Sequence, residues 1–374
     1  MNAAHAITPQ TRNARGVVLN GKYLASKQKS GVFRVADQLT RHVDAELSAN
    51  GADGWTMVCP PDAGDLPDLQ AIRTRIAGPL TWQVWEQFQL PFESRGQLLV
   101  NLCNLAPIAH PGSITMIHDA QVFTSPQSYS RAFAAWYRFV LPRVGATAHR
   151  ILTVSEYSRR QLVEFGVCDY DRIEVLHNGA DHILDLSADP DVVAAHGLEP
   201  GAYALSFSTT QSHKNLKVLF EAFHRPELAD IKLVLVGGTG PAQYAEAGLT
   251  PPLGAIYTGR TSDEQLRALL ESAGCLAFPS TTEGFGLPPL EAMTVGCPVV
   301  VAPCGALPEV CGDAAAYAGH DDPAEWALQI RDMIQSPGVR DSFRAKGLSQ
   351  AAKFRWVDSA RRLIALVESS RGAV

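Results

Sequence analysis

Residues 279–292 read PSTTEGFGLPPLEA, directly after the apolar run from Cys275 to Phe278. The apolar run predicts a buried strand, and two prolines just beyond the glycines suit the first turn of a helix. Between strand and helix, the backbone amides of Phe285, Gly286 and Leu287 can turn toward an anion. This strand, glycine loop and helix are typical of one repeat of a parallel α/β sheet.

The same alternation of short apolar runs and helical periods continues on both sides of this stretch. It restarts after a polar segment near residues 185–200, which predicts two consecutive α/β units. The strands expected before that segment are 16–19, 97–100, 114–117, 151–154 and 173–176. Those expected after it are 203–207, 231–236, 255–258, 275–278 and 298–301.

Helix-start signals mark the second unit. Ser212 precedes an apolar stripe at residues 216, 219, 220 and 223, so we expect it to cap a helix. Ser262 and Gln265 form a capping box, and Gly296 suits the end of the helix that Pro288 opens. Each of these helices begins just after a strand, at the sheet edge where ligands bind in open parallel sheets.

Two glutamates flank the glycine loop, Glu283 before it and Glu291 in the expected first helical turn. Carboxylates accept hydrogen bonds from vicinal hydroxyls, so the pair suits a sugar and a ribose. The alternative is an ordinary helix start with two solvent-facing acids. The segment resembles the signature of glycosyltransferase family four, the retaining GT-B enzymes. That resemblance implies that Glu283 contacts the transferred sugar, that Glu291 contacts the ribose, and that Gly284, Phe285, Gly286 and Leu287 line the donor site.

Lys214, in the run Ser212-His213-Lys214-Asn215, resembles the phosphate-binding lysine of the same family. An ammonium at a helix start would neutralise a diphosphate together with free amides. The family often has an arginine several residues earlier, where this chain reads Ser208-Thr209-Thr210-Gln211. Arg260, after the strand at 255–258, is the candidate replacement. The alternative for Lys214 is a surface lysine.

Two residues in the first half of the chain, Gly31 and His118, complete the predicted functional site. Gly31, in the run Ser30 to Arg34, resembles the short glycine loop that faces the donor phosphate, and an ordinary strand-to-helix turn is the alternative. His118 follows a strand and begins the His-Asp pair of the family, which implies contact with a sugar hydroxyl or the attacked oxygen. The predicted catalytic residues are therefore His118, Glu283 and Lys214.

The resemblance extends over most of the chain, through Trp85-Glu86-Gln87, residues 154–158, residues 175–181 and the closing segment from Phe354. It implies a GT-B fold, in which two Rossmann-like α/β domains with parallel sheets face each other across a cleft. We expect an acceptor-binding domain at 1–185, a nucleotide-sugar-binding domain at 186–355, and a final helix at 356–374 that crosses back to the first domain.

The composition indicates which binding partners and which cellular compartment to expect. A formal net charge of -6 gives no global attraction to nucleic acid, and seven scattered cysteines argue against a disulfide framework. The polar start lacks the apolar core of a signal peptide, and no apolar run is long enough to span a membrane. We therefore expect a cytoplasmic protein. Aromatic and basic residues within 131–150 suit either a core helix or peripheral contact with the inner face of a membrane.

The predicted activity is retaining transfer of a hexose from a nucleotide-diphosphate sugar to a glycan or polyprenyl-linked acceptor in polysaccharide synthesis. The resemblance implies no metal ion and no cofactor. Mannose from GDP-mannose is the first choice, and UDP-glucose or a deoxysugar nucleotide is the alternative. A non-catalytic sugar-nucleotide-binding subunit is the alternative of another class. A nicotinamide dehydrogenase is disfavoured because Gly237-Gly238-Thr239-Gly240 lacks the final glycine of the dinucleotide fingerprint.

Overall fold

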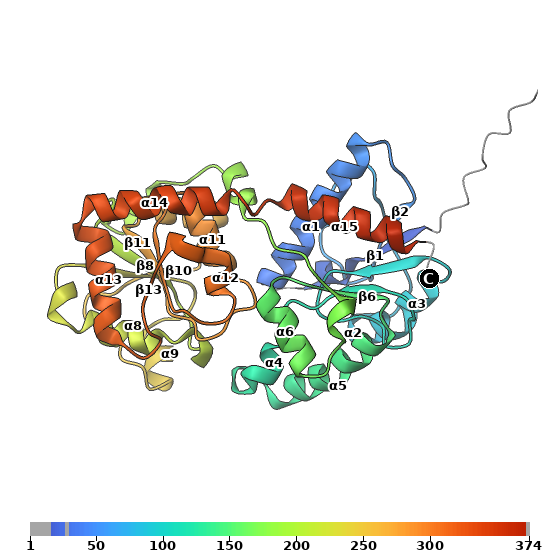
Figure 1. Cartoon of the computed structure of the whole chain (residues 1–374), viewed down its shortest axis with the longest axis horizontal. Coiled ribbons are helices and arrows are strands. Elements are labelled where there is room, and N and C mark those ends of the chain that lie inside the picture. Colours follow the sequence, from blue (N-terminus) through green and yellow to red (C-terminus); the bar gives the residue numbers. More distant parts are fainter. Residues whose placement is uncertain (1–15, 27–29, 372–374) are drawn as a thin grey trace, which may run out of the picture. The chain divides into compact units, whose positions relative to one another are not determined.

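A computed structural model describes residues 16–26 and 30–371 (Figure 1). The chain divides into two compact units. The first comprises Met1–Met116, Thr147–Arg150 and Ala360–Val374, and the second comprises Ile117–Ala146 and Ile151–Ser359. The predicted domain boundaries at residues 185 and 355 remain a prediction.

The first sheet has the strand order β3-β2-β1-β4-β5-β6-β7. Its neighbouring strands run parallel where their register is described, for example Val17 beside Trp55 in β1 and β2. The order reverses beside β1, as in a doubly wound Rossmann sheet. The strands are β1 (Val17–Asn20), β2 (Trp55–Cys59), β3 (Arg73–Ile76), β4 (Leu98–Asn101), β5 (Ile114–Met116), β6 (Arg150–Thr153) and β7 (Ile173–Val175).

The second sheet has the order β10-β9-β8-β11-β12-β13, all parallel, with the same reversal, here between β8 and β11. The prediction of two Rossmann-like α/β sheets is therefore confirmed. The strands are β8 (Tyr203–Phe207), β9 (Lys232–Val236), β10 (Ile256–Gly259), β11 (Cys275–Phe278), β12 (Val299–Val301) and β13 (Ala315–Tyr317).

Three strands escaped the sequence analysis. β3 reads Arg-Thr-Arg-Ile and is mostly exposed at the edge of its sheet, so it has no apolar run to detect. β13 reads Ala-Ala-Tyr and is also an edge strand, built largely from a residue with low strand propensity. β2 is apolar and buried, and its Trp-Thr-Met-Val-Cys run was a signal that could have been recognised.

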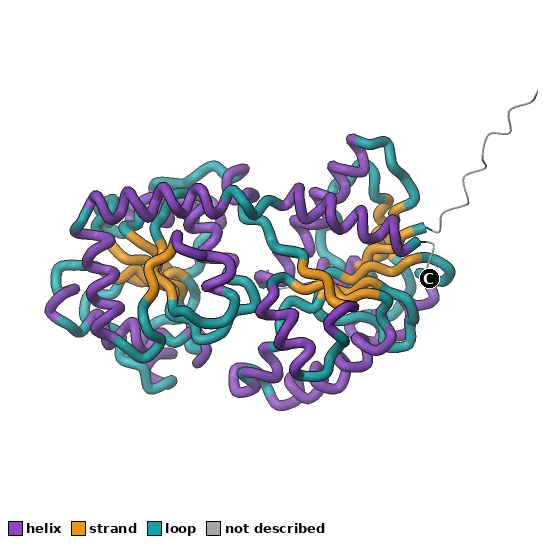
Figure 2. The backbone as a smooth tube through the Cα atoms, in the orientation of Figure 1, coloured by secondary structure: helices purple, strands orange, loops and turns teal. Residues whose placement is uncertain are grey.

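Helices flank the strands in both units (Figure 2). The longer ones are α1 (Gly31–Ala49), α5 (Arg131–Thr147), α6 (Glu156–Glu164), α8 (Leu216–Phe223), α10 (Asp263–Ser272), α11 (Leu287–Thr294), α13 (Pro323–Gln335), α14 (Pro337–Ala351) and α15 (Trp356–Ser370). Shorter ones are α2 (Trp82–Val84), α3 (Leu90–Glu93), α4 (Gln121–Thr124), α7 (Asp191–Ala195), α9 (Pro241–Glu246) and α12 (Leu307–Cys311). A π-helical turn, η2, spans Trp85–Gln89, and 3-10 turns are η1 (Gly21–Ala25), η3 (Pro126–Ser128), η4 (Tyr170–Arg172), η5 (Asp181–Asp185), η6 (Ser212–Lys214), η7 (Pro226–Leu228) and η8 (Gly312–Ala314).

Two of the predicted helix starts agree with the structure, and the third does not. The Ser262–Gln265 capping box forms at α10, and Pro288 lies in the first turn of α11 with Gly296 just beyond its end at φ 76°. The prediction for Ser212 is wrong, because the residue that precedes α8 is Asn215 in a left-handed conformation and Ser212 begins a separate 3-10 turn. A residue in the left-handed (αL) conformation turns the chain sharply. The apolar stripe of α8 therefore begins after Asn215, and Ser212 lies too far back to cap it.

The closing helix, α15, contributes Trp356 to Ser359 to the second unit and its remainder to the first. In the first unit Arg361 makes a bidentate ion pair with Glu46 of α1, with N–O distances of 2.9 and 3.0 Å. In the second, the backbone amide of Trp356 donates to Asp181 at 2.9 Å. Polar contacts therefore hold the start of this helix to the second unit and its continuation to the first.

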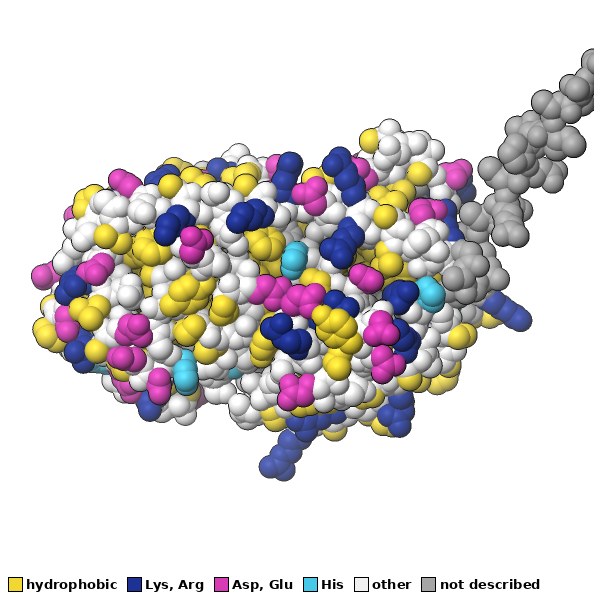
Figure 3. Space-filling view, viewed as in Figure 1, with side chains coloured by type: hydrophobic (Ala, Val, Ile, Leu, Met, Phe, Trp, Pro, Cys, Tyr) yellow, Lys and Arg dark blue, Asp and Glu magenta, His cyan; other side chains and the backbone are white. Residues whose placement is uncertain are grey.

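The described surface mixes both signs of charge. Figure 3 shows acidic and basic side chains interspersed over the face drawn, in agreement with a net charge of only -6. Among the described residues, none of the helices combines the length and apolar character that crossing a membrane requires.

Candidate functional site

Two residues of opposite charge lie where the second sheet reverses its strand order. Lys214 follows β8 and Glu283 follows β11, and these two strands are neighbours. The Lys214 Nζ lies 2.6 Å from Glu283 Oε1, with the lysine side chain 26% exposed and the glutamate side chain 11% exposed. The ammonium also lies 5.2 Å from the ring centroid of Phe278. The pair is thus half-buried at the edge where open α/β sheets bind ligands.

The loop after Glu283 presents backbone donors. The amides of Phe285, Gly286 and Leu287 make no hydrogen bond with any described residue. Gly286 has φ 99° and precedes α11, a conformation that a residue with a Cβ rarely adopts. Unpaired amides at the start of a helix favour an anion, so the loop and Lys214 together can neutralise one.

Neighbouring backbone fixes the position of Glu283. Its carbonyl accepts the amide of Ala306 at 3.0 Å. A Cβ on Gly305, which has φ 63°, would lie 2.5 Å from the Glu283 nitrogen, so only glycine permits this approach. Gly305 escaped the sequence analysis, because a close backbone contact between segments leaves no local pattern.

Glu291 differs from its predicted setting. It is the fifth residue of α11 and therefore lies beyond the first turn. Its Oε1 lies 3.1 Å from Nε2 of His182, and the indole of Trp356 donates to Nδ1 of the same imidazole at 3.0 Å. Because Nδ1 accepts, Nε2 carries the proton and donates to Glu291. Both side chains are nearly buried, so one carboxylate oxygen of Glu291 is already bound.

His118 and Asp119 pack directly on the glycine loop. A Cβ on Gly284 would lie 2.8 Å from the Asp119 Cβ and 3.0 Å from the His118 carbonyl oxygen. Burial raises the pKa of Asp119 above its ordinary value, the amide of Gln121 lowers it, and the negative charge of Glu283 raises it further. The structure thus places His118 and Asp119, which follow β5, beside the loop that contains Glu283.

His213, immediately before Lys214, is buried and makes hydrogen bonds to two other segments. Burial lowers the pKa of this histidine, and the charge of Lys214 lowers it further. Its Nδ1 lies 2.8 Å from the Ser128 hydroxyl, and its carbonyl accepts the amide of Thr281 at 2.8 Å. The segments that carry Lys214 and Glu283 are therefore joined by a backbone hydrogen bond, one residue before Lys214 and two residues before Glu283.

The remaining predicted residues are Arg260 and Gly31. Arg260 is exposed and lies against the glycine loop after β9, with its Nε 3.2 Å from a Cβ built on Gly238. It makes no ion pair with any described residue. Gly31 belongs to the first unit, where it is the first residue of α1 and the Ser30 hydroxyl accepts the Phe33 amide at 3.3 Å.

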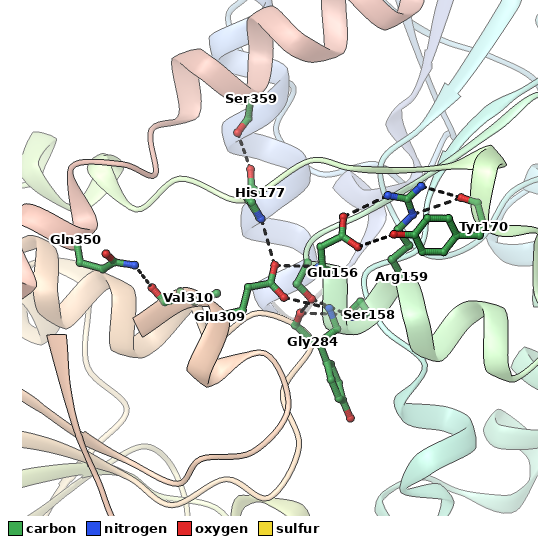
Figure 4. Close-up of polar contacts among 12 residues, drawn as sticks. Glu156, Ser158, Arg159, Tyr170, His177, Gly284, Glu309, Val310, Gln350 and Ser359 are labelled. Carbon is green, nitrogen blue, oxygen red and sulfur yellow. Dashed lines mark hydrogen bonds and ion pairs between the residues drawn. The ribbon is translucent and has the colours of Figure 1, made fainter. Parts of the chain in front are cut away.

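A second group of polar residues, which the sequence analysis missed, contacts either the glycine loop or the start of α6 beside it. Figure 4 shows Glu309 of α12 reaching the start of α6, and Ser158 of α6 reaching Gly284. Ser155 and Ser158 lie in a segment that the resemblance covers, but nothing in the sequence indicated that their hydroxyls meet Gly284. Glu309 gave no signal, since its partners lie more than a hundred residues away.

Within residues 16–26 and 30–371, no three His, Cys, Asp or Glu side chains form a group that could hold a metal ion. The sequence contains two Asp-x-Asp triplets, Asp169-Tyr170-Asp171 and Asp189-Pro190-Asp191. Neither belongs to such a group among the described residues.

Two families match consecutive parts of the chain: "Glycosyltransferase Family 4" over residues 94–184 and "Glycosyl transferases group 1" over residues 193–350. The O-antigen chain mannosyltransferase B of Escherichia coli is 32% identical over 255 residues, covering 65% of this chain and 67% of that relative. A D-inositol 3-phosphate glycosyltransferase of Nocardioides sp. is 30% identical over 256 residues, and the aligned part covers 62% of this chain and 56% of that relative.

Solved structures share the whole fold. Sucrose-phosphate synthase from Thermosynechococcus elongatus superposes with a TM-score of 0.73 at 18% identity, covering 96% of this chain and all of that one. The Anabaena protein HepE in complex with UDP-glucose superposes with a TM-score of 0.68 at 16% identity, covering 95% of this chain and all of that one. With the doubled Rossmann-like sheets and the family matches, the conclusion is direct: the chain belongs to the group 1 glycosyltransferases of family four and has the GT-B fold.

Proposed function

We propose that this glycosyltransferase moves a hexose, with retention of configuration, from a nucleotide-diphosphate sugar to a glycan or polyprenyl-linked oligosaccharide. The observation that carries the proposal is the half-buried Lys214–Glu283 pair beside three unpaired backbone amides. A diphosphate needs positive charge and a sugar needs a hydroxyl acceptor, and this edge of the sheet offers both within one small volume.

In the proposed mechanism Lys214 and the loop amides take up the negative charge that develops on the departing diphosphate. An ammonium has three donors, so Lys214 can keep its bond to Glu283 while it contacts a phosphate oxygen. Glu283 has a second carboxylate oxygen for a sugar hydroxyl. The leaving phosphate would accept the proton of the acceptor hydroxyl as that hydroxyl attacks the same face of the sugar.

The other predicted residues take supporting roles in this proposal. His118 donates to a hydroxyl of the transferred sugar, Glu291 binds the ribose with assistance from His182, and Gly31 and Arg260 approach the phosphates. Protein groups alone supply the positive charge, so we propose that no metal ion takes part. The reaction would occur in the cytoplasm, at the inner face of the membrane where the acceptor is a lipid-linked glycan.

We propose mannose from GDP-mannose as the donor, because the Escherichia coli relative is an O-antigen chain mannosyltransferase. UDP-glucose is the second candidate, because HepE was solved in complex with that sugar nucleotide. A surface-polysaccharide intermediate is the corresponding acceptor.

A panel of GDP-mannose, UDP-glucose, dTDP and ADP sugars would test the proposal on the full chain. Binding of one donor should raise the melting temperature. The same donor should give a glycosylated product when membrane lipid or oligosaccharide acceptors are added. Binding without transfer to any acceptor and without donor hydrolysis would instead favour a non-catalytic sugar-nucleotide-binding subunit.

A further inference from the structure

The carbonyl of Gly284, in the middle of the glycine loop, receives two hydroxyl hydrogen bonds. Ser155 Oγ donates at 2.6 Å and Ser158 Oγ donates at 3.0 Å. Both serines are completely buried. Ser155 also caps α6, since its Oγ accepts the Ser158 amide at 3.0 Å. A hydroxyl has a single proton, so each serine commits its only donor to this one carbonyl.

Holding that carbonyl fixes the direction of the next amide. The C=O of Gly284 and the N–H of Phe285 belong to one planar trans peptide group and therefore point in opposite directions. With the carbonyl turned to the two serines, the Phe285 amide points away from α6. Among the described residues that amide has no acceptor, so it stays available to a ligand.

Glu309 holds the start of α6 in place. Its two carboxylate oxygens accept the amides of Glu156 and Tyr157 at 2.9 and 3.0 Å, and His177 Nε2 lies 3.3 Å from the same carboxylate (Figure 4). Burial opposes ionisation, but the hydrogen bonds from His177 and the two amides keep the pKa of Glu309 below its ordinary value. A carboxylate suits this position, because it satisfies orphan helix amides and complements the helix dipole.

These contacts close a ring around the glycine loop. α12, which contains Glu309, begins at Leu307, and the preceding Ala306 donates to the Glu283 carbonyl at 3.0 Å. The ring thus runs from Glu283 through Gly284 to the serines, along the start of α6 to Glu309, and back through α12 to Glu283.

We propose that Ser155, Ser158 and Glu309 are positioning residues that orient the Phe285 amide and Glu283 toward the diphosphate and sugar of the donor. This inference rests on the proposed function, since it assigns a donor to the loop. None of the three residues needs to touch the donor, because they act through the Gly284–Phe285 peptide and through the segment that carries Glu283.

The test compares matched variants of the full chain. Ser158→Ala removes one hydroxyl from the Gly284 carbonyl and leaves the Ser155 cap in place. Thr294→Ala is its control, because Thr294 Oγ1 makes a similar bond to the Leu290 carbonyl, at 2.8 Å, within α11. Glu325→Gln is the control for Glu309→Gln. Glu325 also accepts a backbone amide, that of Gly319 at 2.7 Å, but neither residue belongs to the glycine loop. Ser158→Thr keeps the hydroxyl and serves as the rescue variant.

We expect Ser158→Ala and Glu309→Gln each to lower kcat about tenfold, the size of one lost transition-state hydrogen bond, with a smaller change in donor KM. Thr294→Ala, Glu325→Gln and Ser158→Thr should stay near wild type. Affinities for GDP and UDP, measured by calorimetry, should fall in the first two variants alone. Melting temperatures would separate these effects from simple loss of folded protein.

The inference is overturned if Ser158→Ala and Glu309→Gln match their controls in kcat and nucleotide affinity, or if activity falls only with the folded fraction. If wild type binds GDP or UDP but transfers no sugar, the proposed function fails, and the affinity comparison still decides this inference. If wild type binds none of GDP, UDP, dTDP and ADP or their sugars, both the proposed function and this inference are overturned.

Discussion

Both sheets carry a lysine–glutamate pair at the point where the strand order reverses, but the two pairs have different surroundings. In the first sheet, Lys22 Nζ lies 2.7 Å from Glu86 Oε2, and the glutamate side chain is 2% exposed. Asn20, the last residue of β1, donates to the other oxygen of Glu86 at 3.0 Å and to Asn101 at 3.0 Å. Gln83 accepts a further proton from Lys22 at 2.7 Å.

The second pair, Lys214 and Glu283, lacks such a closed network. It is more exposed, and it borders three amides that have no acceptor among the described residues. A charge pair whose hydrogen bonds are all satisfied specifies structure, whereas one with donors left over can bind a ligand. The same topological position thus serves folding in one sheet and, in our proposal, chemistry in the other.

Removing the second pair should have the largest effect on activity. Glu283→Ala and Lys214→Ala should each reduce transfer by about a hundredfold or more, as expected for lost transition-state contacts. The folded structure should persist, because Lys214 is partly exposed and the backbone of Glu283 keeps its bond from the Ala306 amide. Initial rates with the identified donor would measure the effect, and near-normal turnover in either variant would refute the role given to that residue.

Removing the first pair should have the opposite signature. Glu86→Ala removes one of the two acceptors of Lys22 and one of the two acceptors of Asn20. We expect it to lower the free energy of unfolding by about 2 kcal/mol, after allowance for the partial exposure of Lys22. Denaturant titration would measure this loss. The kcat per folded molecule should stay near wild type, and a large fall in kcat at unchanged stability would show that the contrast between the pairs is wrong.

Two glycines, one in each unit, differ in the space around them. Gly305→Ala should cost about 1–2 kcal/mol for a left-handed alanine, and its Cβ would also displace the backbone of Glu283. Nothing lies within 4 Å of a Cβ on Gly31, so Gly31→Ala should leave the melting temperature unchanged. If Gly31→Ala nevertheless weakens GDP or UDP binding, the open space at the start of α1 is used by the ligand, as the sequence predicts.

A smaller effect is expected at Asp119, beside the second pair. Its pKa is raised by burial in the folded chain, so the unfolded chain loses its proton at a lower pH. The free energy of unfolding therefore falls as the pH rises from the ordinary value of 3.8 to the folded pKa, and stays low above it. Asp119→Asn removes this penalty and should raise the melting temperature slightly at neutral pH. A gain that persisted below pH 3.8 would exclude this explanation.

The smallest expected effect is that of chelation. Because the proposal assigns the charge of the diphosphate to Lys214 and backbone amides, excess EDTA should leave the transfer rate unchanged. Loss of activity that manganese restores would show that a metal ion supplies part of this charge.

Local patterns were enough to predict much of the fold. Apolar runs identified β8 and β11 to the residue, and the Ser262–Gln265 box identified the start of α10. The edge strands β3 and β13 were missed, because pairing at a sheet edge needs no apolar run. Ser212 was wrongly predicted to cap α8. The sequence shows a serine before the apolar stripe, but it does not show that Asn215 adopts a left-handed conformation between Ser212 and the helix.

For the candidate site, the residue types could be predicted without the fold: a lysine after one strand, two acids around a glycine loop, and a histidine–aspartate pair after a third strand. The contacts could not be predicted: that Lys214 meets Glu283, that His182 binds Glu291, and that the Ser155 and Ser158 hydroxyls meet the Gly284 carbonyl. The physical reason is that strand and helix signals arise from neighbours along the chain. Hydrogen bonds between segments 69 or more residues apart depend on strand order and close packing, which no local pattern records.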